Sequence, residues 1–326
     1  MIARIPIFRY NRLDDSIDER ISASMTAYMT RLEERIRLLD TSVLVGLDPR
    51  WDQLPAEITR GEMSPSRERI AEGFRQFCCE LINIVSTLVP AVKPQVAFFE
   101  RLGPAGMEAL HHVMKYARSK QLVVIADAKR SDIGSTAEAY SDAWLDGTSG
   151  KAAFPADALT VNPYLGDDTL QPFVDTALQR NAGIYVLVRT SNVGAVAFQD
   201  RKTDGTTVFE AVADTIQQLN LEHRAEGQWG PVGAVVGATW PQELADLRAR
   251  MPNTPFLVPG YSTQGGTAAD VAAALQCGPA GALINSSRAI NFAWRRPEWK
   301  DRFGEEYWRE AVLASTQQMI SDLHCI

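Results

Sequence analysis

Short apolar segments alternate with longer amphipathic ones along most of the chain. Eight of them, three to six residues long, are rich in β-branched or other apolar side chains, which predicts strands buried on both faces. The predicted strands span 43–47, 91–93, 122–126, 158–161, 184–188, 232–237, 256–258 and 281–285. Because each interval has room for a helix, the alternation predicts repeated βα units.

Apolar residues at helical spacing fill the intervals. The clearest stripe begins at Ile70 and Phe74, and continues through Phe77, Leu81, Val85 and Leu88. Ser64 and Pro65 before it predict an N-cap followed by proline at the first helical position. Further helices are predicted over 106–119, 170–180, 207–224, 241–250 and 267–277. The polar, Gly-containing residues 146–156 and 196–207 are expected to be loop insertions.

An additional helix is predicted before the first strand, over residues 17–39. Its apolar face contains Ile21, Met25, Leu32, Ile36 and Leu39. We expect this face to pack on the rest of the protein or on a partner subunit, rather than on a membrane.

Eight successive βα units predict an α/β fold of the (β/α)8 TIM-barrel type, and 326 residues lie within the range of that fold. A doubly wound open sheet is the alternative. It is disfavoured because Gly46-Leu47-Asp48-Pro49, and no G-x-G-x-x-G motif, follows the first predicted strand. We expect a helical extension over residues 1–42, packed on a single catalytic barrel over residues 43–326.

Composition narrows the functional classes. The net charge is −7 and no basic tail is present, which argues against nucleic-acid or anionic-membrane binding. The four cysteines have no C-x-x-C spacing, and the four histidines form no zinc pattern. No apolar signal core lies near Met1, and no apolar run reaches membrane-spanning length. We therefore expect a cytoplasmic protein with reduced thiols and no metal.

Residues 127–136 (DAKRSDIGST) are the most informative part of the chain, because charged side chains crowd the end of a buried strand. Side chains two apart in a strand share a face, so Asp127 and Lys129 should point the same way, with Asp132 on the following turn. By itself this pattern also fits a solvated turn with a surface ion pair.

Two further strand ends carry charge. Asp48 ends the first predicted strand and Lys93 the second. Either residue alone fits a structural role, Asp48 as a turn former and Lys93 as a surface lysine. Because functional groups of barrels lie at the carboxyl ends of strands, the four charges together predict an active-site network.

A phosphate site is predicted after the last two strands. Residues 259–266 (PGYSTQGG) follow the seventh strand, and Arg288 follows the eighth. Backbone amides beside glycine bind anions, and a guanidinium matches phosphate geometry. Barrel phosphate sites occupy this position, so the combination favours phosphate binding over a simple turn.

The motif 127–136, together with residues 259–266 and Arg288, resembles the orotidine 5′-phosphate decarboxylase family, most closely its longer bacterial branch. The resemblance extends from about residue 43 to residue 290, and the motif is highly specific. The chain departs from the family pattern at Ser131, where many members have glycine. It also has a polar sequence, Asn285-Ser286-Ser287, before the arginine.

The resemblance implies decarboxylation of orotidine 5′-monophosphate to uridine 5′-monophosphate, the last step of pyrimidine nucleotide synthesis, without a cofactor. It implies that Lys129 protonates the ring carbon after CO2 leaves, and that Asp127 lies near the substrate carboxylate. Asp48 and Lys93 would position the ribose hydroxyls.

The resemblance also implies a homodimer. Asp132, with Thr136 nearby, would enter the neighbouring subunit's site.

The remaining implied contacts concern the two ends of the nucleotide. Gln264 and Arg288 would bind the phosphate beside Gly265 and Gly266, and Gln264 would also face the pyrimidine. Ser191 would contact the pyrimidine edge, although it could instead shape the turn after the fifth strand.

Two other functions are compatible with the motif. A Mg²⁺-dependent sugar-phosphate decarboxylase or epimerase should have an additional acid at the second strand, where this chain has Lys93-Pro94-Gln95. A non-catalytic phosphoribosyl-binding protein would bind nucleotide without turnover.

Overall fold

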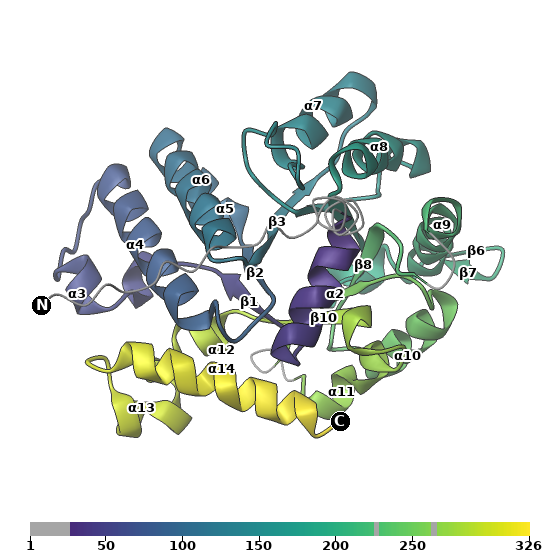
Figure 1. Ribbon diagram of the computed structural model, residues 1–326. Coiled ribbons are helices and arrows are strands. Elements are labelled where there is room, and N and C mark those ends of the chain that lie inside the picture. Colours follow the sequence, from purple (N-terminus) through teal and green to yellow (C-terminus); the bar gives the residue numbers. More distant parts are fainter. Residues whose placement is uncertain (1–26, 225–227, 262–265) are drawn as a thin grey trace, which may run out of the picture.

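The structure is a computed structural model that describes residues 27–224, 228–261 and 266–326. Eight parallel strands close into a barrel in the order β1-β10-β9-β8-β5-β4-β3-β2, with helices around it (Figure 1). The barrel strands are β1 (Val43–Leu47), β2 (Ala91–Pro94), β3 (Val123–Arg130), β4 (Ala158–Val161), β5 (Gly183–Arg189), β8 (Val232–Val236), β9 (Phe256–Val258) and β10 (Ala282–Ser286). The predicted (β/α)8 barrel is confirmed.

Each predicted strand overlaps an observed one. The largest difference is in β3, which continues four residues beyond the predicted end and so includes the first four residues of the 127–136 motif. The pairing of β3 with β4 shifts register between Ala126 and Arg130, which marks a bulge at this strand end. The charged motif therefore belongs to the barrel wall as well as to the turn after it.

Helices occupy the intervals between the barrel strands, precede the first strand and follow the last. The longer ones are α2 (Tyr28–Leu39), α4 (Arg67–Val85), α6 (Pro104–Ser119), α7 (Gly134–Trp144), α8 (Gln171–Arg180), α9 (Val208–His223), α10 (Pro241–Arg250) and α14 (Trp308–His324). The shorter ones are α3 (Ala56–Thr59), α5 (Val96–Glu100), α11 (Ala268–Val271), α12 (Arg288–Asn291) and α13 (Pro297–Phe303). The sequence pattern predicted neither α7 nor α14.

Two helix predictions were wrong in detail. The cap of α4 is Ser66, whose hydroxyl accepts a hydrogen bond from the Arg69 amide at 3.2 Å, so Ser64 and Pro65 precede the cap. The predicted helix over 267–277 is only the single turn α11 followed by the 3₁₀ helix Ala272–Leu275. Small alanine side chains there bury little area to stabilise a longer helix.

Helix α2 covers the amino-terminal mouth of the barrel (Figure 1). Leu32 and Ile36 are buried in one cluster with inward-facing strand residues such as Leu44, and the Tyr28 hydroxyl lies 2.9 Å from that of Tyr185. Of the face predicted for residues 17–39, Leu39 is half-buried, whereas Ile21 and Met25 lie outside the described residues.

The C-terminal helices cover the outside of the barrel near α4. Phe77 of α4 stacks on Phe292 with ring centroids 5.8 Å apart, and it also contacts Trp294 and Trp308. In Figure 1, α13 and α14 lie along one side of the barrel. In the part of the chain that the structure describes, no helix is both long and apolar enough to cross a bilayer.

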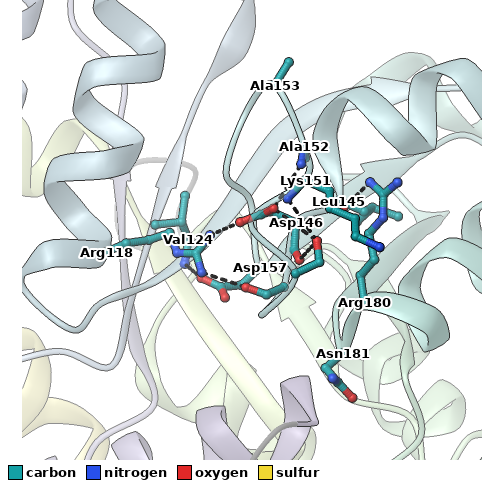
Figure 2. Close-up of polar contacts among 12 residues, drawn as sticks. Arg118, Val124, Leu145, Asp146, Lys151, Ala152, Ala153, Asp157, Arg180 and Asn181 are labelled. Atoms are coloured by element: carbon teal, nitrogen blue, oxygen red, sulfur yellow. Dashed lines mark hydrogen bonds and ion pairs between the residues drawn. The ribbon is translucent and has the colours of Figure 1, made fainter.

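The polar segment 146–156 is a loop, as predicted, and many hydrogen bonds fix it (Figure 2). Asp146 accepts from Arg118 at 2.5 Å and from the Ala152 amide at 3.0 Å. Asp157 accepts from the Val124 amide at 2.9 Å and from Arg31 of α2 at 2.6 Å. These contacts order the amino-terminal end of the barrel, opposite the predicted charge network.

Candidate active site

A cavity of about 1080 Å³ opens at the carboxyl ends of the barrel strands. This is the end at which (β/α)8 enzymes place their catalytic groups. Its polar lining includes Asp48, Lys93, Gln95, Asp127, Lys129, Thr160, Asn162, Ser191, Ser287 and Arg288. Its apolar lining includes Leu187, Phe198, Phe209, Val235 and Leu257. Charged groups and an apolar wall thus face one space.

Asp127 is the centre of the charge network. Its Oδ2 atom lies 2.7 Å from the Lys93 Nζ atom, and its Oδ1 atom lies 2.5 Å from the Lys129 Nζ atom. Gln95 donates to Oδ2 at 3.0 Å, and the Thr160 hydroxyl donates to Oδ1 at 3.1 Å. Both oxygens therefore accept two bonds, which fixes the plane of the carboxylate.

The backbone of Lys129 is held in an uncommon conformation. Its φ is +50°, in the left-handed region that is unfavourable for a side chain with a Cβ atom. The Lys129 amide donates to the Thr160 hydroxyl at 2.9 Å, so β4 supports this geometry. Strain of this kind gathers at functional sites, where surrounding contacts maintain it.

Burial and charge oppose each other at Asp127 and Lys93. Burial disfavours the charged carboxylate of Asp127, but the ammonium groups of Lys93 and Lys129 outweigh burial and hold its pKa well below the usual range. For Lys93, burial lowers the pKa, and the charges of Asp127 and Asp48 outweigh it, so the pKa is raised. Both groups are therefore ionised near neutral pH.

Asp48 joins this network from the end of β1. Burial raises its pKa, while the nearby charge of Lys93 opposes that shift. Its amide donates to Asn291 Oδ1 at 3.0 Å, and Asn291 in turn donates to the Gly46 carbonyl at 2.7 Å. A Cβ atom on Gly46 would lie 1.9 Å from the Ser287 hydroxyl, so only glycine allows β1 and the start of α12 to approach this closely.

Of the two predicted phosphate segments, Pro259, Gly260, Tyr261 and Arg288 line the cavity. Arg288, the first residue of α12, is exposed. Gln264 and Gly265 lie outside the described residues. Gly266 is buried and lines a neighbouring cavity outside the barrel instead, so the structure does not bring this predicted substrate contact into the main cavity.

Asp132 and Thr136 are not among the residues that line the cavity. Asp132 is half-buried and Thr136 exposed, on the turn and first helical residues after β3. Asp132 accepts a hydrogen bond from the adjacent Ile133 amide at 2.8 Å, and Ile133 is 62% exposed. In this chain, therefore, the segment faces outward.

No group of three His, Cys, Asp or Glu side chains in the described residues could hold a metal ion. Asp48 and Asp127 are the two carboxylates that line the cavity, and the charge of Lys93 acts on both.

Comparison with known proteins identifies the family. A sequence model of the orotidine 5′-phosphate decarboxylase / HUMPS family matches residues 41–295. The chain belongs to this family. It is 47% identical over 300 residues to an orotidine 5′-phosphate decarboxylase of Rhodopirellula baltica, with 92% of this chain and 99% of the relative covered.

A second relative and a solved structure agree with this assignment. An orotidine 5′-phosphate decarboxylase of Deinococcus radiodurans is 41% identical over 261 residues, covering 80% of this chain and 87% of the relative. The solved OMP decarboxylase of Leishmania donovani is 31% identical and superposes with a TM-score of 0.70, covering 92% and 98% of the two chains. The family resemblance inferred from the 127–136 motif is therefore confirmed.

Sequence reasoning missed three residues of this decarboxylase-family site. Gln95 and Thr160 orient Asp127, and Asn162 lines the cavity one residue beyond β4. Each lies at or just beyond the carboxyl end of a barrel strand, which is the signal that could have found them. They were overlooked because uncharged polar residues at strand ends are also common in turns.

Proposed function

We propose that this chain decarboxylates orotidine 5′-monophosphate to uridine 5′-monophosphate and CO2, with Lys129 as the proton donor. The observation that carries the proposal is the Lys93–Asp127–Lys129 network at the carboxyl ends of β2 and β3. Family membership supports the reaction. The roles of individual residues are inferred from their geometry and from the sequence motif.

The network suits loss of CO2 from a pyrimidine. An ionised Asp127 next to the substrate carboxylate raises the energy of the bound substrate, and this repulsion disappears as neutral CO2 forms. Two unit charges 4 Å apart interact by roughly 4 kcal/mol at an effective dielectric constant near 20, which is about three decades of rate. Repulsion alone is too small for so slow a reaction, so the developing carbanion must also be stabilised.

Lys129 supplies that stabilisation. Its ammonium group is 2.5 Å from Asp127, so it lies beside the position that the leaving carboxylate would occupy. As the C–CO2 bond breaks, the electron pair stays on ring carbon C6, and the ammonium first attracts it and then transfers a proton to it. Lys93, held at 2.7 Å on the other carboxylate oxygen, keeps Asp127 ionised and oriented.

The other proposed contacts bind the rest of the nucleotide. Asp48 and Lys93 meet the ribose hydroxyls, and Ser191 meets the pyrimidine edge from the loop after β5. Arg288, Gln264 and Gly265 bind the phosphate. Binding energy at the phosphate, remote from the reacting carbon, contributes to closing and desolvating the site.

We infer a homodimer that shares its sites. Asp132 and Thr136 belong to an outward-facing segment next to the exposed Ile133 and outside the cavity of their own subunit. A partner subunit placed against this segment would receive Asp132 at its own cavity.

We also infer that residues 43–326 form one catalytic domain and that residues 1–42 are its extension. We infer that the protein acts in the cytoplasm.

The competing Mg²⁺-dependent reaction is less well supported. At the position where an acid would be needed, Gln95 donates a hydrogen bond to Asp127. An amide whose N–H group faces a carboxylate leaves that oxygen less available to a cation.

The test follows the loss of orotidylate absorbance with purified protein, with and without EDTA. We expect turnover at the same rate in both, because protein charges perform every step. Absence of turnover by the well-folded protein would contradict the proposed function. Turnover that EDTA abolishes, and Mg²⁺ restores, would favour the metal-dependent alternative.

A further inference from the structure

Arg189, the last residue of β5, is a buried charge that does not line the cavity. Its side chain is 1% exposed and forms two ion pairs, at 2.5 Å with Asp200 and at 3.2 Å with Glu243 of α10. The guanidinium also lies over the rings of Phe209 and Trp240, with its carbon 5.1 and 4.7 Å from their centroids. One side chain thus joins a strand end, a loop and two helices.

The loop that Arg189 contacts forms one wall of the cavity. We call residues 190–200 the wall segment; Thr190, Ser191, Asn192, Phe198 and Gln199 of it line the cavity. Within it, Gln199 accepts from the Thr190 amide at 3.0 Å and donates to the Thr190 hydroxyl at 2.7 Å, which closes the segment on itself. Asp200 ends the wall segment and pairs with Arg189, the residue just before it.

The arrangement is not optimised for stability alone. Among the described residues, the Arg189 Nε atom and the Glu243 Oε2 atom are buried without a hydrogen-bond partner. Buried ion pairs contribute little net stability against an apolar replacement, because both charges must be desolvated. Buried ion pairs are better known for favouring one conformation of the chain over the alternatives. In this protein, the ion pairs of Arg189 would favour one conformation of the wall segment.

We propose that Arg189 and Asp200 are a positioning pair that holds the wall segment against the nucleotide and so determines how tightly the nucleotide binds. Neither residue touches the reacting atoms. The inference rests on the proposed function, since it takes the cavity to be the nucleotide site. Because neither Arg189 nor Asp200 lines the cavity, the pair should act on binding of the nucleotide and not on proton transfer at Lys129, and its effect should be equal in the substrate complex and the transition state. Losing them should then raise KM and leave kcat unchanged.

The test uses Asp200→Asn in the full-length chain, which removes the charge at the loop end and leaves the Arg189–Glu243 pair. We expect KM for orotidylate and Kd for uridine 5′-monophosphate to rise about tenfold, as loss of one hydrogen bond to a charged group predicts, with kcat changed by less than about twofold. Asp200→Glu keeps the carboxylate and should retain most of the wild-type affinity. Arg189→Lys loses the guanidinium, which can bond two carboxylates at once, and should weaken the affinity as Asp200→Asn does.

Asp214→Asn is the matched control. Asp214 pairs with Arg250 at 2.5 and 2.6 Å on the outer surface of the same two helices, α9 and α10, and neither residue lines the cavity. This variant should keep wild-type KM and Kd. Equal KM shifts in Asp200→Asn and Asp214→Asn, or a wild-type KM in Asp200→Asn, would overturn the positioning role. Absence of turnover in the wild type would contradict the proposed function instead, so the two failures are distinguishable.

Discussion

Asp127 shows how single residues in this site combine stability with chemistry. It is buried, yet two ammonium groups and two neutral donors satisfy it completely. Removing one member of a buried charged network leaves the others uncompensated. The stability of the protein should therefore depend on the Asp127 charge, and hence on pH.

Asp127→Asn should lower the free energy of unfolding by about 3 kcal/mol at pH 7, because Lys93 then lacks its nearest counter-charge. The folded-state pKa of Asp127 is depressed, so its contribution is fully present above the unfolded carboxyl value of about 3.9. The contribution is lost as the pH falls below that value toward the folded pKa. Urea unfolding at pH 7 and pH 3 measures both effects.

The wild type and Asp127→Asn should therefore become more similar in stability as the pH is lowered. A difference that stays constant from pH 7 to pH 3 would show that the carboxylate charge is not what stabilises the network.

The charged residues of the site could be predicted because each lies at a strand end, where burial and charge conflict. Asp48, Lys93, Asp127 and Lys129 do line one cavity with Arg288. The uncharged residues Gln95 and Thr160 could not be predicted, because their roles depend on which strand lies beside β3 in space. The left-handed backbone of Lys129 also has no local signal, since glycine or asparagine is usual there.

At the scale of elements, the strands could be predicted because they are buried on both faces. Helix α7 could not be predicted from the apolar pattern, because it buries few and mostly small side chains. Each of the eight barrel strands contains a short run of buried apolar residues, whereas α7 buries only Ala137, Ser141 and Trp144. Periodicity cannot reveal a helix with so narrow an apolar face. The cap of α4 was misplaced by two residues because Ser64 and Ser66 are equivalent candidates in sequence.

Helix α2 should contribute stability without contributing to the chemistry, since it covers the opposite end of the barrel from the cavity. Leu32 is fully buried in the α2 cluster, so Leu32→Ala should lower the free energy of unfolding by about 2–5 kcal/mol. Turnover per folded molecule should stay at the wild-type value. Denaturant unfolding and an active-site-normalised assay measure these two quantities.

Leu38→Ala on the same helix is the control, because Leu38 is 71% exposed and should change stability by less than about 0.5 kcal/mol. Equal destabilisation by the two variants would contradict the packing assigned to α2. A fall in turnover of folded Leu32→Ala would show that the helix influences the active site.

At the scale of the whole molecule, the proposed sharing of Asp132 between subunits can be tested by complementation between two inactive variants. Mixing Lys129→Ala with Asp132→Ala subunits gives hybrid dimers in which one of the two sites has both residues intact. Random exchange makes about half of the dimers hybrid, so about a quarter of the wild-type activity should return.

Lys129→Ala mixed with Asp127→Ala is the matched control, because both residues line the same subunit's cavity and no hybrid site is intact. That mixture should stay inactive. If subunit exchange is demonstrated and the Lys129→Ala and Asp132→Ala mixture also stays inactive, the sites are not shared in the proposed way.

The most direct measurement compares single-turnover rates of orotidylate decarboxylation for the wild type and Lys129→Ala, with uridine 5′-monophosphate affinity measured alongside. The account predicts that the rate falls at least about a thousandfold, because proton donor and electrostatic partner are lost together, while the product still binds. A Lys129→Ala protein that binds nucleotide and decarboxylates within about tenfold of the wild-type rate would contradict it.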